Sequence, residues 1–131
     1  MTMMHVALFV AVLGVLLVPA QASEPFPFGS ELILDAAPMP GSKRVPMLEI
    51  DDDGAAVIDL WCASLRGRAT VGDDSITIVP SQTQSTQCEP ERQASDAALL
   101  AALADTTQWR RAGDVIELSG STTLRFRLMT N

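Results

Sequence analysis

The sequence predicts an α+β domain with a mainly antiparallel sheet and a single α-helix. Short apolar runs separated by hairpin-length turns make up most of the chain. One segment, residues 94–104, is rich in Ala and Leu and has the composition of a helix. Further short runs follow this segment, so strands and helices do not alternate as they do in βαβ winding. The 131 residues fit one domain.

The N-terminus has the pattern of a secretory signal peptide, residues 1–22. The run from Val6 to Val18 is apolar and is followed by small residues ending at Ala22. A run of 13 residues is too short to span about 30 Å of hydrocarbon comfortably as a helix. We expect cleavage after Ala22 and a periplasmic or secreted protein, an uncleaved membrane anchor being the alternative. No cysteine follows directly, so we expect no lipid anchor and no transmembrane segment after cleavage.

Composition narrows the classes of function. The net charge of −7 argues against nucleic acid as a partner, because phosphate binding needs clustered positive charge. The only histidine, His5, lies in the predicted signal peptide, which removes the commonest general base and metal ligand from the mature chain. We therefore expect no enzyme, no metal site and no cofactor. A hydrolase working from carboxylates is the remaining enzymatic hypothesis, and no acid pair stands in a recognisable motif.

The first elements after the signal peptide are extended. Residues 23–30 contain two prolines and form an extended or loose N-terminal lead, and the domain proper is expected over residues 31–131. Strands are predicted over residues 31–36 and 44–50. Pro46 should place the second of these at a sheet edge, because proline cannot donate to a ladder.

Three strands and two turns follow. Asp-Gly at Asp53-Gly54 predicts a hairpin turn before a strand over residues 55–60. A calcium loop is the alternative for this acidic turn, although the 12-residue ligand spacing is missing. Residues 65–71 alternate apolar with polar, and residues 76–79 form the next strand after Gly72-Asp73-Asp74.

The predicted helix and the closing strands complete the order. Pro90 suits the first helical position, although Ser95 and Asp96 offer a rival start. Leu99, Leu100 and Leu103 form one stripe of this helix. Three strands are expected after it, over residues 107–112, 115–118 and 123–128.

Cys62 and Cys88 are the only cysteines. An even number of cysteines in an exported chain indicates a disulfide, and closing a loop of this length contributes about 3.5 kcal/mol. Two free thiols and a redox-active pair are the alternatives, the latter lacking the C-x-x-C spacing.

This arrangement resembles the META/HslJ domain family over residues 31–128. The resemblance rests on a cysteine after a strand, a Thr/Ser-rich run into a second cysteine, an Ala/Leu helix and three closing strands. Members commonly carry Gly-Cys-Asn where this chain has Trp61-Cys62-Ala63. The matching motifs are Thr83 to Cys88, Trp109, Gly113-Asp114 and Leu124-Arg125-Phe126.

The resemblance implies a fold and a broad role. The fold is a strongly curled, half-open barrel with the helix against it, and a similar shape occurs in secretin pilot lipoproteins, which bind lipid or a partner peptide. Family members are small envelope or secreted domains associated with heat shock, stress response and novobiocin resistance. The resemblance supplies no catalytic residues.

Five residues are candidates for binding. Arg66 and Arg68 should share the outer face of one strand, and Arg125 and Arg127 that of another. If these strands lie close together, the four arginines form a basic stripe that could hold a carboxylate or phosphate. The alternative is a solvated face. Trp61, beside the cysteine, is a ligand candidate at the mouth of a curled sheet, with core packing as its alternative.

We therefore expect an exported, non-enzymatic META/HslJ-like domain, monomeric, that supports the cell envelope or stress tolerance. Its partner would be an envelope protein or a small apolar ligand. The second hypothesis is a secreted protease inhibitor or interaction module.

Overall fold

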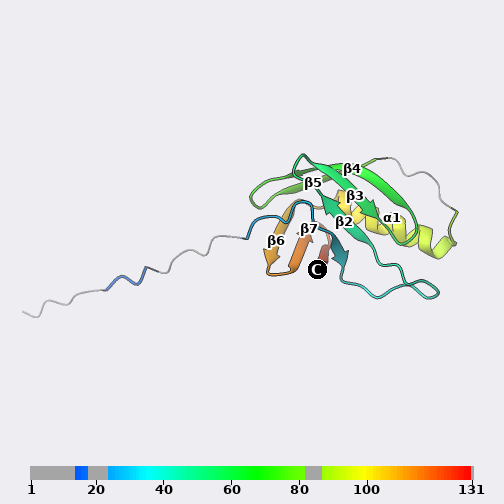
Figure 1. Cartoon of the computed structure of the whole chain (residues 1–131), viewed down its shortest axis with the longest axis horizontal. Coiled ribbons are helices and arrows are strands. Elements are labelled where there is room, and N and C mark those ends of the chain that lie inside the picture. The colour runs from blue at the N-terminus through cyan, green and yellow to red at the C-terminus, as the bar shows by residue number, and fades with distance from the viewer. Residues whose placement is uncertain (1–13, 18–23, 82–86, 131) are drawn as a thin grey trace, which may run out of the picture.

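A computed structural model describes residues 14–17, 24–81 and 87–130 of the chain. It contains one antiparallel sheet and one helix (Figure 1). The eight strands are ordered β5-β4-β3-β2-β1-β8-β7-β6 across the sheet. In chain order the elements are β1 (Leu32–Leu34), β2 (Met47–Ile50), β3 (Ala55–Asp59), β4 (Ser64–Val71), β5 (Ile76–Pro80), α1 (Pro90–Ala104), β6 (Gln108–Ala112), β7 (Val115–Ser119) and β8 (Thr123–Leu128).

The sheet curls until its two end strands nearly meet. A single bridge joins Ser75, before β5, to Gln108 at the start of β6. Next to it, Trp109 N–H donates to Asp74 O at 3.0 Å, and Ile76 N–H donates to Thr107 O at 3.0 Å. The result is a barrel with one seam, which confirms the predicted α+β class and half-open barrel.

Helix α1 connects the two strands that flank the seam and packs against β5. It begins at Pro90, as predicted, since a proline there loses no helical hydrogen bond. Its buried residues are Leu99, Leu103 and also Asp96, which lies one turn before Leu99 on the same stripe.

The core fills the inside of the barrel. Alternate residues of each strand point inward, so the buried positions follow the period of two that the sequence shows. The side chains of Ile58, Phe126, Ile116 and Leu118 are each at most 1% exposed. The inner set also includes Leu32, Leu48, Ile50, Leu60, Leu65, Ala69, Ile76, Ile78 and Trp109.

The turn between β2 and β3 is the predicted hairpin turn. Gly54 has a φ of +90°, a conformation that glycine adopts without a steric penalty. Ala55 N–H donates to the carboxylates of Asp51 and Asp53, at 2.9 and 3.2 Å. The acidic side chains thus satisfy the backbone of their own turn.

The prediction of an edge position for the strand around Pro46 is wrong. β2 pairs with β1 on one side and with β3 on the other, so it is an interior strand. Pro46 lies one residue before β2 begins and contributes its carbonyl, which accepts from Leu34 N–H at 2.9 Å. The missing N–H therefore falls outside the ladder, and an interior strand tolerates the proline.

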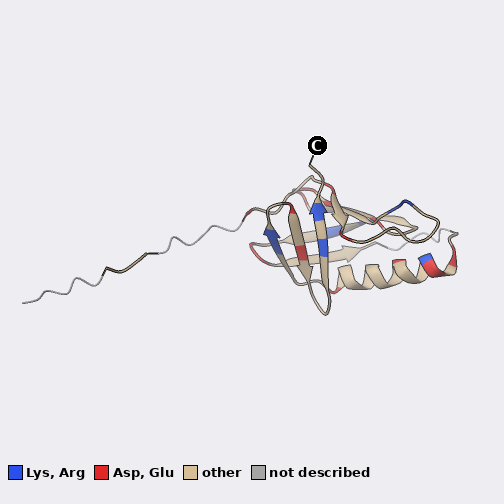
Figure 2. Ribbon diagram, turned by 90° about the horizontal axis from the view of Figure 1, so that it is seen from below, with Lys and Arg blue, Asp and Glu red and all other residues tan. Residues whose placement is uncertain are grey.

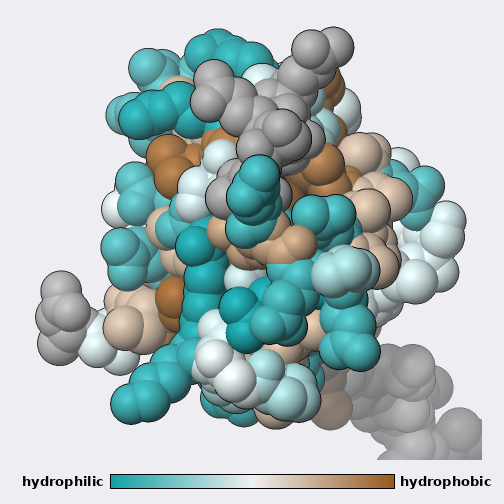
Figure 3. All heavy atoms as spheres, turned by 90° about the vertical axis from the view of Figure 1, so that its right-hand side faces the viewer, coloured by the Kyte–Doolittle hydropathy of each residue, from teal (hydrophilic) through white to brown (hydrophobic). Residues whose placement is uncertain are grey.

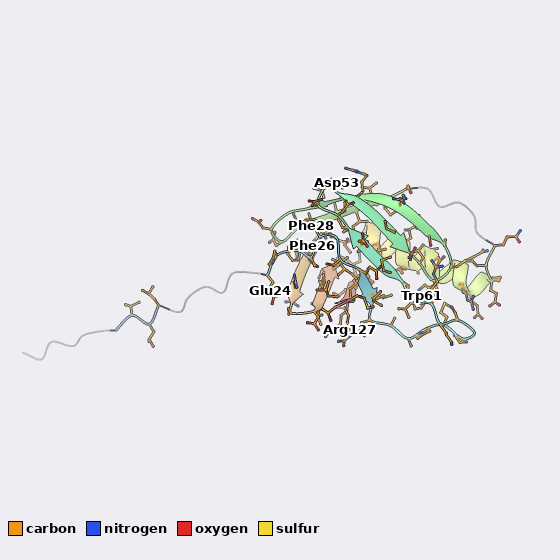
Figure 4. All side chains as sticks on the ribbon, viewed as in Figure 1. Glu24, Phe26, Phe28, Asp53, Trp61 and Arg127 are labelled. Atoms are coloured by element: carbon orange, nitrogen blue, oxygen red, sulfur yellow. A yellow bond between two sulfur atoms is a disulfide. The ribbon has the colours of Figure 1, made fainter. Side chains whose placement is uncertain are left out.

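The N-terminal lead forms no strand over its described residues 24–30, turns at Phe28 and Gly29, and is packed on the barrel. Phe26 is 6% exposed and belongs to the core, and Pro27 is buried as well. Figure 4 shows Phe26 and Phe28 close together at the end of the barrel that carries β6. The folded unit therefore includes Phe26, which sequence analysis placed outside the domain.

Two features of the sequence fall largely outside the described residues. These are the predicted signal peptide, apart from residues 14–17, and most of the Thr/Ser-rich run before Cys88, of which residues 82–86 are not described. Within the part of the chain that is described, no helix has the length and apolar content needed to cross a membrane.

Candidate functional site

Cys62 and Cys88 meet at one corner of the barrel. Cys62 lies in the turn between β3 and β4, and Cys88 lies just before α1. The two residues are at disulfide distance, with their Cα atoms 6.3 Å apart. A bond here ties the β3–β4 turn to the start of the helix.

The same corner is held by the buried carboxylate of Asp96, a residue that the sequence suggested only as part of a rival helix start. Asp96 is 8% exposed. Its two oxygens accept from Cys62 N–H at 3.1 Å and from Ala63 N–H at 2.8 Å. The sequence contains one indication that Asp96 is buried: it lies three residues before Leu99 on the apolar stripe of the helix. A charged residue in such a position needs hydrogen-bond or ionic partners.

Arg44 completes the corner from the other side. Its guanidinium donates to Leu60 O at 2.8 Å, to Ala63 O at 3.2 Å and to Ser64 Oγ at 2.9 Å. The turn thus has its amides bound by a carboxylate and its carbonyls bound by a guanidinium. Trp61 is half-buried here and packs against the core, which favours the packing interpretation of this residue.

The four candidate arginines face outward, as predicted, but they do not form one stripe. Arg66 and Arg68 are exposed on β4, and Arg125 and Arg127 are exposed on β8. Three strands, β3, β2 and β1, separate β4 from β8 in the sheet. The strands belong to a curled sheet, so the two pairs point in different directions.

The arginines of β8 are engaged in ion pairs on the outer face of the sheet. Arg125 lies 3.4 Å from Asp35 and 3.6 Å from Glu117, and Arg127 lies 3.4 Å from Asp35. Glu117 also pairs with Arg110 at 2.6 Å. Figure 2 shows these basic and acidic bands side by side on neighbouring strands. Their charges are balanced locally, so this face offers an incoming anion little net attraction.

The face of the molecule that carries the first turn of α1 shows no large apolar surface. In Figure 3 its visible atoms are mostly hydrophilic, and the hydrophobic patches are small and interrupted by polar side chains. A broad apolar interface is therefore not offered on the described part of this face.

The described part of the chain has an open groove at the seam, beside β6. Its volume is about 740 Å³. A second hollow of about 570 Å³ adjoins it and shares Glu24, Asp73 and Trp109 with it. The groove is bounded by the whole of β6, by the β4–β5 turn and by the N-terminal lead.

Charged and aromatic side chains from distant parts of the sequence meet in this groove. Arg111 Nε lies 3.2 Å from the carboxylate of Glu24. The same guanidinium donates to Pro25 O at 3.0 Å and to Gly113 O at 2.8 Å. The ring of Phe26 meets the ring of Trp109 edge to face, with centroids 5.2 Å apart. Local sequence patterns do not reveal these contacts, because Pro25 and Arg111 are 86 residues apart in the chain.

Trp109 is fixed in the wall of the groove by its polar edge. Its indole N–H donates to Gly72 O at 2.8 Å, and its backbone N–H donates to Asp74 O at 3.0 Å. The ring is therefore anchored to the β4–β5 turn while it contacts the Phe26 ring of the lead. It is 8% exposed and belongs to the hydrophobic core.

The shifted pKa values lie in turns outside the groove. A hydrogen bond with Asp53 raises the pKa of Asp51, and the same bond lowers the pKa of Asp53. Hydrogen bonds from Ser121 lower the pKa of Asp105. No cluster of three or more metal-ligating side chains occurs among the described residues. The groove thus offers positioned charges and rings, which suit binding.

The structure defines a small α+β domain with a nearly closed, single-seamed antiparallel barrel. The profile of the META domain family matches residues 30–130, and the chain belongs to this family. No curated protein sequence matches the chain.

Two solved structures share the fold. A protein solved by NMR superposes with a TM-score of 0.59 at 14% identity, over 76% of this chain and 88% of that one. A DUF4847 family protein from Bacteroides vulgatus superposes with a TM-score of 0.53 at 14% identity, over 63% of this chain and 57% of that one. At this identity the two structures show a common fold.

Proposed function

We propose that this protein is an exported, non-enzymatic META-family domain that supports the cell envelope by binding a protein segment in the groove beside β6. The observation that carries this proposal is the position of the groove along the end strand of the sheet. The backbone N–H of Trp109 points across the seam, where it donates to Asp74 O. Alternate residues of an antiparallel strand direct their backbone N–H and C=O groups to the same edge, so those of Arg111 point to the seam as well. An edge strand of this kind can accept an extended segment of another protein.

The walls of the groove favour a protein segment over a small apolar ligand. Glu24, Asp73 and Arg110 provide charges of both signs, and the buried Trp109 forms part of the wall. The inside of the barrel, in contrast, is filled by core side chains that are almost fully buried. A small apolar molecule would have to displace that packing.

A non-catalytic role is supported by the way the ionisable groups of the groove are used. Glu24 and Arg111 are paired with each other, and both also bind backbone groups. These contacts engage both side chains with partners within the protein itself. Asp73 and Asp74 lie exposed in a turn.

Export to an oxidising compartment is supported by the cysteine pair and by the leading segment. The cysteines lie at disulfide distance, and such bonds persist outside the cytosol. An apolar run followed by small residues precedes the domain. An envelope location would bring the groove into contact with periplasmic or secreted partners.

Site-specific photocrosslinking in the producing cell tests the proposal. A benzophenone amino acid replaces Ala112, which is exposed in β6 and lines the groove. The matched control carries the same change at Ala98, an exposed alanine of α1. We expect one adduct, identified by mass spectrometry as an envelope protein, from position 112 only.

The result discriminates between the functions considered. Absence of an adduct at position 112, or the same adduct from position 98, would refute binding in the groove. A secreted protease as the crosslinked protein would assign the inhibitor function instead.

A further inference from the structure

The N-terminal lead occupies the end of the barrel without belonging to the sheet. Its described part, residues 24–30, forms no strand, yet Phe26 is buried to 6% exposure. It reaches β1 through Gly29, whose φ of +74° favours glycine. Gly29 N–H donates to Ile50 O at 2.9 Å. The lead is thus a peptide outside the sheet that is attached at a turn and lines the groove.

The polar contacts of this peptide converge on two residues of the barrel. Arg111 holds the Glu24 carboxylate at 3.2 Å and donates to Pro25 O at 3.0 Å. Gly113 N–H donates to the other oxygen of Glu24 at 3.1 Å. A carboxylate is therefore bound by a guanidinium and a backbone amide together, which is the chemistry of a carboxylate-binding site.

The apolar contact lies two residues further along the peptide. Phe26 meets Trp109 edge to face, with ring centroids 5.2 Å apart. Phe28 lies 5.0 Å from Phe26 but remains 42% exposed. One ring is thus held by the barrel while the next one is partly exposed to solvent.

We propose that Trp109, Arg111 and Gly113 form a lead-binding site whose preferred ligand is an extended protein segment with a carboxylate residue two positions before an aromatic residue. Glu24 to Phe26 is its resident occupant, and a partner segment of the same chemistry displaces it. This inference rests on the proposed function, for which it names the partner chemistry and a self-occluded state. Displacement of the lead uncovers Trp109 and clears one wall of the groove.

Charge complementarity and the mode of attachment support displacement by a partner. The site offers one cation and one indole ring at the spacing of an acidic residue and a ring in one peptide. Residues 24–28 belong to no strand and pair with none, so their release leaves the strand pairing of the barrel intact, with Gly29 still bound to Ile50 O. A competing segment therefore exchanges like contacts for like.

The test uses the full exported chain and the indole N–H signals of its two tryptophans in NMR spectra. Trp109 reports on the lead-binding site, and Trp61, near the cysteine corner, serves as the internal control. Phe26→Ala loosens the resident lead, and the probe is a synthetic peptide with the sequence of residues 24–30. We expect the peptide to shift only the Trp109 signal, with an affinity for Phe26→Ala about tenfold or more above that for the wild type.

Three controls keep the test decisive. A peptide with Gln in place of its Glu, or the double variant Phe26→Ala with Arg111→Ala, should lose the Trp109 shift. If Phe26→Ala fails to fold, Glu24→Gln in the chain provides the loosened lead, and the native peptide should again bind it more tightly than it binds the wild type.

Other results would overturn the inference. Shifts of both tryptophans, equal affinities for variant and wild type, or no binding would refute the lead-binding site. Concentration-dependent dimers of the wild type that are lost in Phe26→Ala would identify a second copy as the occupant in place of a partner. If position 112 still crosslinks a partner while the peptide does not bind, the lead-binding site fails and binding along β6 stands.

Discussion

Removing the Asp96 carboxylate should destabilise the domain strongly, although the residue lies on a helix and makes no ion pair with a described residue. Its oxygens are the acceptors for Cys62 N–H and Ala63 N–H, and Ala63 is itself 9% exposed. In Asp96→Ala water cannot easily replace the lost acceptor at Ala63. A hydrogen bond to a charged group is worth about 1.5–3 kcal/mol, and the more exposed Cys62 amide adds less. We expect Asp96→Ala to lower the free energy of unfolding by about 3 kcal/mol in total.

Urea unfolding followed by tryptophan fluorescence measures this loss. With a slope of about 1.5 kcal/mol per molar, the midpoint should fall by about 2 M at an unchanged slope. Asp96→Asn should recover less than half of the loss, because its amide group brings an N–H donor against a backbone donor. The matched control is Asp52→Ala, the same change at an exposed turn position, which should stay within about 0.5 kcal/mol of wild type.

A specific outcome would refute this reasoning. If Asp96→Ala and Asp52→Ala unfold at the same urea concentration, the carboxylate does not hold the β3–β4 turn. The corner would then depend on the cysteine pair and on Arg44 alone.

Four further predictions concern processing, the cysteines, the outer face and the sheet. Intact mass of the exported protein should correspond to cleavage after Ala22, whereas a membrane fraction that keeps Met1 would contradict the signal peptide. Thiol titration without reductant should find no free thiol, and Cys88→Ser should cost a few kcal/mol in urea unfolding, on the order of 3; two titratable thiols would exclude the bond. Arg125→Ala combined with Arg127→Ala should lower stability by less than about 1 kcal/mol, because exposed ion pairs contribute little; a variant that unfolds would show that these pairs are structural. Gly67→Ala should reduce the melting temperature, since its Cβ would lie 2.7 Å from a carbonyl oxygen of β5; an unchanged melting temperature would show that the β4–β5 pairing can shift at no cost.

Local patterns in the sequence determined the elements and their faces. The alternation over residues 65–71 and 123–128 predicts which side chains point inward, because a strand places successive side chains on opposite faces. Pro90 and the Ala/Leu content after it predict the helix, since these are intrinsic preferences of the backbone. Residue type and spacing likewise predict the Asp-Gly turn before β3 and the pairing of the two cysteines.

Strand order required the tertiary structure. The sequence shows the outward direction of Arg66 and Arg125 but not that three strands separate them, because side-chain period carries no information on which strands are neighbours. For the same reason Pro46 suggested an edge, whereas β1 and β8 continue the sheet beyond β2. Neighbours in the sheet depend on the whole path of the chain.

The candidate site is also a product of the tertiary structure. Glu24 and Phe26 have unremarkable neighbours in the sequence, and their partners, Arg111 and Trp109, come from the far end of the chain. Asp96 resembles any polar residue of a helix until the fold buries it against the amides of the β3–β4 turn. Local sequence determines which residues can bind a carboxylate or a ring, but only closure of the barrel brings the lead, β6 and the β4–β5 turn to one place, because that closure depends on contacts between distant segments.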